Sequence, residues 1–232
     1  MVDLLGEGLH LTTLENGVRF DFNGNGQPLF MSWTDPSYHN AWLALDRDRN
    51  GSIDSVEELF GYPTEPQIPS REGKRNGWLA LAVYDDPSYG GNGDGLIDAN
   101  DAVFSDLLLW VDENHDGVSQ PTELHHLQEM GVKEIQLKYK DNKSYKDAYG
   151  NTFQFESFVS VSSQDRNTIQ KEQKRQAWDV VLNASDLPPD AIQPNVVCSL
   201  TPKYPHGWDV GLDAPEAFSG DFAMLNVFCA LR

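Results

Sequence analysis

Cysteine is scarce in this sequence, which contains only Cys198 and Cys229. This scarcity excludes a framework of several disulfides. The two residues form either one disulfide around a loop of about 30 residues, which would contribute about 3–4 kcal/mol of stability, or two small buried apolar side chains. The sequence leaves both alternatives open, so it does not determine the redox compartment.

Long apolar runs and basic residues are also lacking. No apolar run approaches the roughly 18 residues that suggest a membrane-spanning helix, and the start of the chain lacks the basic and apolar regions of a signal peptide. The 17 Lys and Arg face 36 Asp and Glu, which gives a formal net charge of −19. This charge argues against binding to nucleic acid or to an anionic membrane surface. We therefore expect either a piece of a longer polypeptide or a protein exported through another segment.

A chain of 232 residues with 39% hydrophobic residues can bury a substantial core in one large domain or two small ones. Its acids do not form one run. Many of them fall within three short loops between residues 46 and 123, and this placement favours a binding role over solubility alone.

The first loop covers residues 46–57 and has the spacing of a twelve-residue calcium loop. Ca²⁺ prefers six to eight oxygen ligands, which alternate residues of a tightly turned loop can supply, and a glycine at position 6 allows the turn. Gly51 occupies position 6. The predicted ligands at positions 1, 3, 5, 7, 9 and 12 are Asp46, Asp48, Asn50, Ser52, Asp54 and Glu57.

The third loop, residues 112–123, repeats this register with Gly117 at position 6. Its predicted ligands are Asp112, Asn114, Asp116, Val118, Gln120 and Glu123. Val118, like the other residues at position 7, would contribute its backbone carbonyl.

The second loop is interrupted. Residues 92–101 supply positions 3 to 12, with Asp101 in place of the longer glutamate, through Asn92, Asp94, Leu96, Asp98 and Asp101. The first ligand must lie further back, at Asp85 or Asp86, so residues 87–91 form a small insertion. We thus predict about three Ca²⁺ ions as cofactors.

A weaker candidate lies at Asp21, Asn23 and Asn25, which match positions 1, 3 and 5. No acid follows at position 9 or 12, so a plain hairpin turn is the favoured interpretation and a fourth calcium site is the alternative.

The hydrophobic pattern predicts an α+β fold of short strands and short helices around three EF-hand-like loops. Strands are expected at 17–22, 29–33, 41–45, 132–139 and 152–161, and helices at 78–84, 98–107 and 123–130. Asn76 is the expected N-cap of the first helix. This calcium-binding domain is expected to cover residues 1–162. Residues 163–232 then form a Pro-rich C-terminal extension or small subdomain, without a catalytic spacing.

Several of these motifs occur together in a known family. The chain resembles the calcium-binding segment of large secreted bacterial RTX-type proteins, and it is similar to the calcium-dependent self-processing module of their iron-regulated members. The resemblance covers about residues 2–182. It rests on residues 2–8 (VDLLGEG), 20–26 (FDFNGNG), 45–54 (LDRDRNGSID), 58–61 (ELFG), 92–98 (NGDGLID), 109–120 (LWVDENHDGVSQ), 123–124 (EL), 131–137 (GVKEIQL), 149–151 (YGN) and 177–182 (AWDVVL).

The resemblance implies two departures from the simple loop count. In the family the acid that closes the first loop falls one position later, at Glu58, and this sequence has both Glu57 and Glu58. The self-processing modules also cut an Asp–Pro bond just upstream of the segment that matches residues 2–8. No such bond precedes Met1 in this sequence, so the activity does not carry over residue for residue.

Two functions follow as hypotheses. The first is a calcium-folded structural or adhesive module, without enzymatic activity, of a secreted protein that meets an extracellular protein or surface ligand. The alternative is an autocatalytic module, in which an Asp carboxylate attacks its own carbonyl and the proline nitrogen leaves. Asp35–Pro36 and Asp86–Pro87 are the internal candidates, although such dipeptides more often only form turns.

Overall fold

The computed structural model describes residues 1–22, 25–61, 64, 66, 75–162, 172–186, 196–201 and 226–231. The chain divides into two compact units, Met1–Pro189 and Asp190–Arg232. The first unit runs past the expected boundary at residue 162, because strand β11 (Glu172–Val181) pairs with β10 (Thr152–Ser162) and with β1 (Val2–Asp3). Most of the expected Pro-rich extension lies outside the described residues.

A nine-stranded antiparallel sheet forms the body of the first unit. Its strands are ordered β5-β8-β10-β11-β1-β4-β6-β7, and β9 pairs with β10 beside β8. A smaller sheet is ordered β12-β3-β2. The remaining strands are β2 (Val18–Phe20), β3 (Leu29–Met31), β4 (Asn40–Leu45), β5 (Leu96–Asp98), β6 (Leu107–Trp110), β7 (Leu124–His126), β8 (Val132–Gln136), β9 (Lys140–Lys146) and β12 (Ala184–Ser185).

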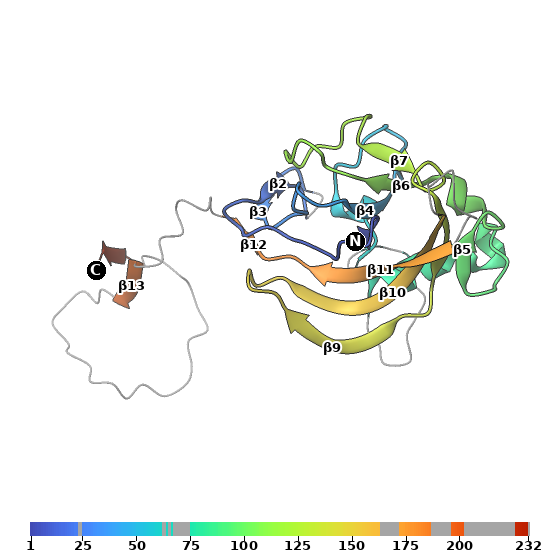
Figure 1. The fold of residues 1–232 in the computed structure, drawn as a ribbon. Helices are drawn as coiled ribbons and strands as arrows, with labels where there is room; N and C mark the ends of the chain where they lie inside the picture. Colours follow the sequence, from blue (N-terminus) through green and yellow to red (C-terminus); the bar gives the residue numbers. More distant parts are fainter. Residues whose placement is uncertain are drawn as a thin grey trace, which may run out of the picture. The chain divides into compact units, whose positions relative to one another are not determined.

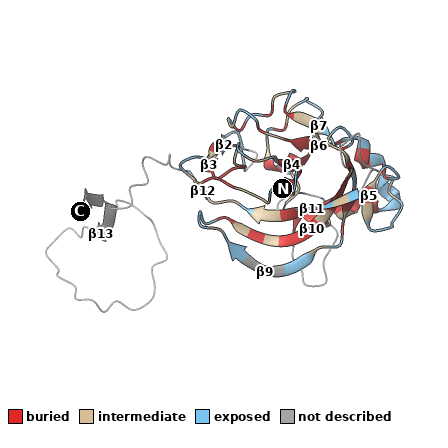
Figure 2. Cartoon of the chain, viewed as in Figure 1, coloured by how far each residue is buried: buried red, intermediate tan, exposed pale blue. Residues whose placement is uncertain are grey.

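The large sheet curls, so that β4, β6 and β7 lie across from β9, β10 and β11 (Figure 1). The short N-terminal strand β1 connects the two halves, since it pairs with β11 on one side and β4 on the other. Buried residues gather on the central strands, whereas the edge strand β9 is largely exposed (Figure 2).

The interior contains two apolar clusters. The larger includes apolar residues of β8, β10 and the one α-helix that the described residues form. The smaller is built around Trp33, which is fully buried and whose ring lies 4.9 Å from that of Trp42, 5.3 Å from that of Trp110 and 5.3 Å from that of Phe20. Tilted and edge-on ring pairs of this kind are favourable beyond the area they bury. Trp42 lies four residues before Asp46, and Trp110 lies two residues before Asp112. This cluster therefore anchors the first and third loops.

The predicted α+β class is wrong, because the described residues form a predominantly β structure with one short α-helix. Helix α1 covers Gly77–Leu81 and continues as the 3-10 helix η2 (Ala82–Asp85). Here the sequence-based prediction is confirmed, and the Asn76 side chain accepts a hydrogen bond from the Leu79 N–H at 2.9 Å. The other 3-10 helices are η1 (Val56–Glu58), η3 (Pro87–Tyr89) and η4 (Ala102–Ser105).

Neither of the other two predicted helices forms an α-helix. Within 98–107 only η4 is helical, and β6 starts at Leu107; within 123–130 the chain forms β7 and then turns. Strand β6 lies between β4 and β7, and these neighbours satisfy its backbone and cover its apolar residues. A short apolar run looks alike in a helix and in a strand, so periodicity did not distinguish them. The loops therefore lack the pair of flanking helices that defines an EF-hand.

The five predicted strand regions are confirmed as β2, β3, β4, β8 and β10. In the second unit, β13 (Val196–Thr201) pairs antiparallel with β14 (Asn226–Leu231), and Cys198 is the backbone partner of Cys229. No helix among the described residues is both long and apolar enough to cross a membrane.

Candidate metal centre

The first loop begins directly after β4, and its first acid organises the turn. Asp46 accepts hydrogen bonds from the backbone N–H of Asn50 at 3.1 Å and of Gly51 at 2.8 Å. Gly51 has φ of +84°, a conformation that glycine adopts without strain. The turn brings the Asp48 carboxylate onto the same side as Asp46.

Glu58, and not Glu57, closes this loop. Its buried carboxylate accepts the N–H of Arg47 at 3.2 Å and of Asp54 at 2.9 Å, which ties the start of the loop to its end. Glu57 is exposed. Carboxylate oxygens of Asp46, Asp48 and Glu58 lie within 4.8 Å of one another, close enough to share one cation.

Burial raises the pKa of Glu58, and the neighbouring charges of Asp54 and Asp48 raise it further against the two backbone hydrogen bonds. A desolvated carboxylate among other carboxylates is costly without a compensating charge. A divalent cation would supply that charge, and the donor set consists of oxygens, as Ca²⁺ prefers.

The third loop, between β6 and β7, repeats the hydrogen-bond pattern of the first. Asp112 accepts the N–H of Asp116 at 3.1 Å and of Gly117 at 2.9 Å. Glu123 accepts the N–H of Glu113 at 3.1 Å, of Asn114 at 3.3 Å and of Gln120 at 3.3 Å. Both acids are buried. Burial raises the pKa of Asp112, and the charges of Glu123 and Asp116 add to this effect.

The second loop starts at Asp85, which ends η2. This buried side chain accepts the N–H of Gly93 at 2.9 Å, of Asp94 at 3.1 Å and of Gly95 at 2.9 Å. Asp86 instead is exposed and caps η3 by accepting the N–H of Ser88 at 2.8 Å. Asp85 therefore takes the position that the sequence left open between the two acids.

Asp101 closes the second loop as Glu58 closes the first. It is buried and accepts the N–H of Asn92 at 3.2 Å and of Asp98 at 2.8 Å. Burial raises the pKa of Asp101. The insertion is accommodated because Gly91 lies against the backbone of Asp85, where an added Cβ would approach the Asp85 carbonyl carbon to 2.2 Å.

The remaining predicted ligands lie on the exposed or partly buried side of the loops. In each loop the amide of the residue at position 3 or 5 donates to a neighbouring acid: Asn50 donates to Asp48 and Asp54, Asn92 to Asp94, and Asn114 to Asp116. Gln120 also donates to Asp116, at 2.8 Å. At position 7, Ser52 and Leu96 are partly buried and Val118 is exposed. The Asp98 carboxylate accepts a hydrogen bond from the Asn100 N–H.

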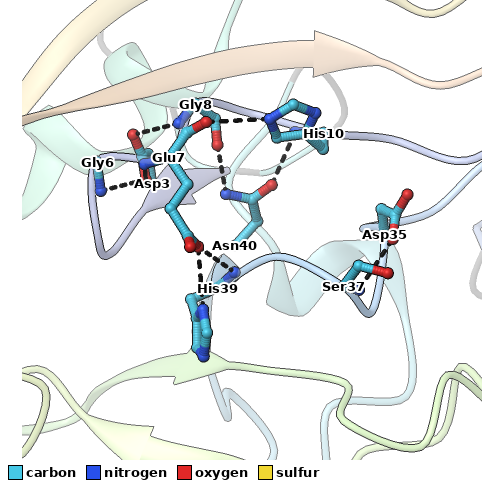
Figure 3. A network of polar contacts seen from close by, with 9 residues as sticks. All are labelled: Asp3, Gly6, Glu7, Gly8, His10, Asp35, Ser37, His39 and Asn40. Carbon is cyan, nitrogen blue, oxygen red and sulfur yellow. Dashed lines mark hydrogen bonds and ion pairs between the residues drawn. The ribbon is translucent and has the colours of Figure 1, made fainter.

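The weaker candidate shares the first half of this geometry only. Asp21 accepts the N–H of Asn25 at 3.2 Å and of Gly26 at 2.6 Å, while Asn23 lies outside the described residues. Asp3 does the same with Gly6, Glu7 and Gly8 (Figure 3). Among the described residues, neither turn has a closing acid like Glu58. The turn at the first acid thus forms with or without such an acid, and the closing carboxylate distinguishes the three full loops.

Two contacts join the loops, and neither was predicted. The N–H of Ile53 donates to the Ser119 hydroxyl at 2.6 Å in the interior, which connects position 8 of the first loop with position 8 of the third. Arg47 reaches from the first loop to Tyr84, immediately before Asp85. Ser119 and Arg47 occupy loop positions without a metal ligand, so the calcium spacing gave no signal for them.

An apolar cavity of about 300 Å³ reaches the end of the first loop at Val56 and is also lined by Trp33, Trp42, Trp178 and Asp179, among others. Burial raises the pKa of Asp179 to about 6, although the Gly77 N–H, which donates to its carboxylate at 2.7 Å, and the positive charge of the Met1 ammonium both oppose the shift. This carboxylate fastens the start of α1 to β11.

Comparison with known proteins places the chain in a family. It is 36% identical over 142 residues to the iron-regulated protein FrpA of Neisseria meningitidis serogroup C, and the match covers 60% of this chain and 12% of that protein. The chain thus spans only a small part of the length of this relative. The model of the SPM domain family matches residues 1–174, a range that contains all three loops. The chain therefore belongs to the SPM domain family.

Proposed function

We propose that this chain is a calcium-binding structural module of a secreted bacterial protein and that it folds on binding Ca²⁺. One observation carries the proposal: three loops of different sequence converge on the same arrangement. In each, a first acid holds the N–H groups of positions 5 and 6, and a buried closing acid holds N–H groups near position 2 or 3 and at position 9. The second and third loops each bury both of these acids, and the first loop buries Glu58 beside the partly exposed Asp46; such burial is costly unless a cation compensates the charges.

The ions would bind near Asp46 and Glu58, near Asp85 and Asp101, and near Asp112 and Glu123. Because the loops connect strands β4, β5, β6 and β7 of one sheet, bound ions would brace its connections. Cytosolic calcium is low, so such a module would remain loose before export and become rigid outside the cell, where an adhesive role with a protein or surface ligand is the proposed use.

The experiment is a calcium titration of chelator-treated protein, with binding measured by isothermal titration calorimetry and folding by far-UV circular dichroism. We expect three ions per chain and a gain of ordered structure. A native spectrum in excess chelator, or a stoichiometry of one or none, contradicts the proposal.

The second candidate function, calcium-dependent cleavage of an Asp–Pro bond, is supported by the resemblance to self-processing modules. The hydrogen bonds of the two aspartates argue against cleavage at the two internal Asp–Pro bonds. Asp35 caps a turn by accepting the Ser37 N–H at 2.9 Å, and Asp86 accepts both the N–H and the hydroxyl of Ser88. Each carboxylate is thereby held toward the residues after the proline.

A further inference from the structure

We propose that Arg47 is a positioning residue that couples calcium binding at the first loop to calcium binding at the second. The inference rests on the proposed function, and it assigns a role to a side chain that carries no metal ligand. Arg47 occupies position 2 of the first loop, yet its side chain contacts Tyr84, which precedes the first acid of the second loop.

The Arg47 guanidinium is held from both loops. Its Nε donates to the Glu57 carbonyl oxygen at 2.6 Å, and its Nη1 donates to the Tyr84 hydroxyl. The guanidinium carbon lies 5.3 Å from the centre of the Phe60 ring and 5.8 Å from that of Tyr84, within the range of cation–π attraction. A planar guanidinium is suited to such combined stacking and hydrogen bonding, whereas a lysine is not.

These contacts lie next to acids of both loops. On one side, Glu57 precedes the closing acid Glu58, and the backbone N–H of Arg47 itself donates to the Glu58 carboxylate at 3.2 Å. On the other side, Tyr84 precedes Asp85, and both belong to η2. Closure of Glu58 over an ion in the first loop therefore fixes Arg47, and Arg47 in turn fixes the segment that presents Asp85.

Such an arrangement makes the two binding equilibria reciprocal, because each ion stabilises the same placement of Arg47. An ion in the first loop should strengthen binding at the second, and the reverse must hold by the same factor. Electrostatic repulsion between two bound cations acts in the opposite direction. Positive coupling therefore appears only if the free energy contributed by the Arg47 contacts exceeds that repulsion.

The test resolves the two sites by nuclear magnetic resonance of the full chain during titration with Ca²⁺. The amide of Gly51 donates to Asp46 and that of Gly95 to Asp85, so each glycine resonance reports on one loop. Glu58→Gln removes an acid of the first loop. We expect it to weaken Ca²⁺ binding at Gly95 by about five- to tenfold in the parent protein, at the lower end of typical coupling.

In an Arg47→Met background the same Glu58→Gln change should alter binding at Gly95 by less than about twofold. Arg49→Met is the matched control, since it removes an equal charge from the same loop; the coupling should persist there. Tyr84→Phe deletes only the hydroxyl and serves if Arg47→Met fails to fold. It should reduce the coupling partially.

The outcomes separate the inference from the proposed function. If neither glycine responds to Ca²⁺ in the parent protein, the calcium proposal fails and the coupling with it. If both respond but Glu58→Gln leaves Gly95 unaffected, the loops bind independently and only the coupling is refuted. If the coupling persists unchanged in Arg47→Met, or in Tyr84→Phe where Arg47→Met does not fold, another contact carries it and the assignment to Arg47 is wrong.

Discussion

The indole Nε1 of Trp110 donates a hydrogen bond to the Glu123 carboxylate at 3.4 Å, in the buried interior beneath the third loop. This contact joins the acid that closes the loop to the aromatic cluster of Trp33, Trp42 and Phe20. A cation in the third loop would draw the Glu123 oxygens toward itself and change the environment of the indole.

The first prediction is therefore that Ca²⁺ alters the tryptophan emission of chelator-treated protein and that Glu123→Gln removes one of three calcium ions. The substitution deletes one of the three predicted acidic ligands in that loop. Emission spectra and native mass spectrometry measure the two effects. Glu113→Gln is the control, because Glu113 is an exposed acid at position 2 of the same loop, and it should retain three ions. Equal losses in the two variants would contradict the assignment.

The second prediction concerns the closing acid of the first loop. Glu58→Gln should weaken calcium binding there by at least about tenfold, equivalent to about 1.4 kcal/mol, because Glu58 is buried beside Asp46 and Asp48. Glu57→Gln should change it by less than about twofold, since the Glu57 side chain is exposed. Calorimetric titration of the two variants measures both. The opposite ranking would show that the simple twelve-residue count is correct.

The third prediction is a large calcium dependence of stability. If each site had a dissociation constant near ~10 μM, then ~1 mM Ca²⁺ would add about 2.7 kcal/mol per site and roughly 8 kcal/mol for three. This is comparable with the entire stability of an ordinary domain, about 5–15 kcal/mol. Denaturant unfolding with and without chelator measures the difference. A difference below about 2 kcal/mol would mean that the hydrophobic core suffices without metal.

The fourth prediction is that the purified chain stays intact in millimolar Ca²⁺. Asp35 and Asp86 each hold their carboxylates in a turn after the proline, away from attack on their own carbonyls. Intact-mass spectrometry over several days measures this. Fragments that end at either residue, and that appear only with calcium, would instead support the autocatalytic function.

The fifth prediction follows from Asp179, whose pKa is raised by burial from 3.8 to about 6. Between these values the folded chain holds a proton that the unfolded chain has lost, so the free energy of unfolding falls as the pH rises through this window. Asp179→Asn removes this cost and keeps an oxygen for the Gly77 N–H. We expect the variant to be more stable at pH 7, by at most about 3 kcal/mol.

The advantage of Asp179→Asn should disappear at about pH 3, where the wild-type carboxyl is protonated in both states. Unfolding curves of the two proteins at about pH 7, 5 and 3, all at the same calcium concentration, provide the comparison. A variant that is less stable than the wild type at pH 7 would show that attraction between the Asp179 carboxylate and the Met1 ammonium outweighs the cost of burying the carboxylate.

The sequence by itself determined the three loops, the strands β2, β3, β4, β8 and β10, and the cap at Asn76. These features depend on neighbours within about a dozen residues: an acid that holds N–H groups four and five residues later, or an alternating apolar pattern. The geometry of residues such as Asp46 and Gly51 therefore follows from the local sequence.

The elements that flank the loops, and the acids that turn inward, depend on contacts between distant parts of the chain. Leu107–Trp110 becomes a strand because β4, more than 60 residues earlier, offers it a free edge. Glu58 is preferred over Glu57 because burial places one side chain toward Asp46 and the other toward solvent. Arg47 meets Tyr84, and Ile53 meets Ser119, only after the sheet curls. Long-range pairing of this kind has no local pattern, so it could not be deduced from the order of residues.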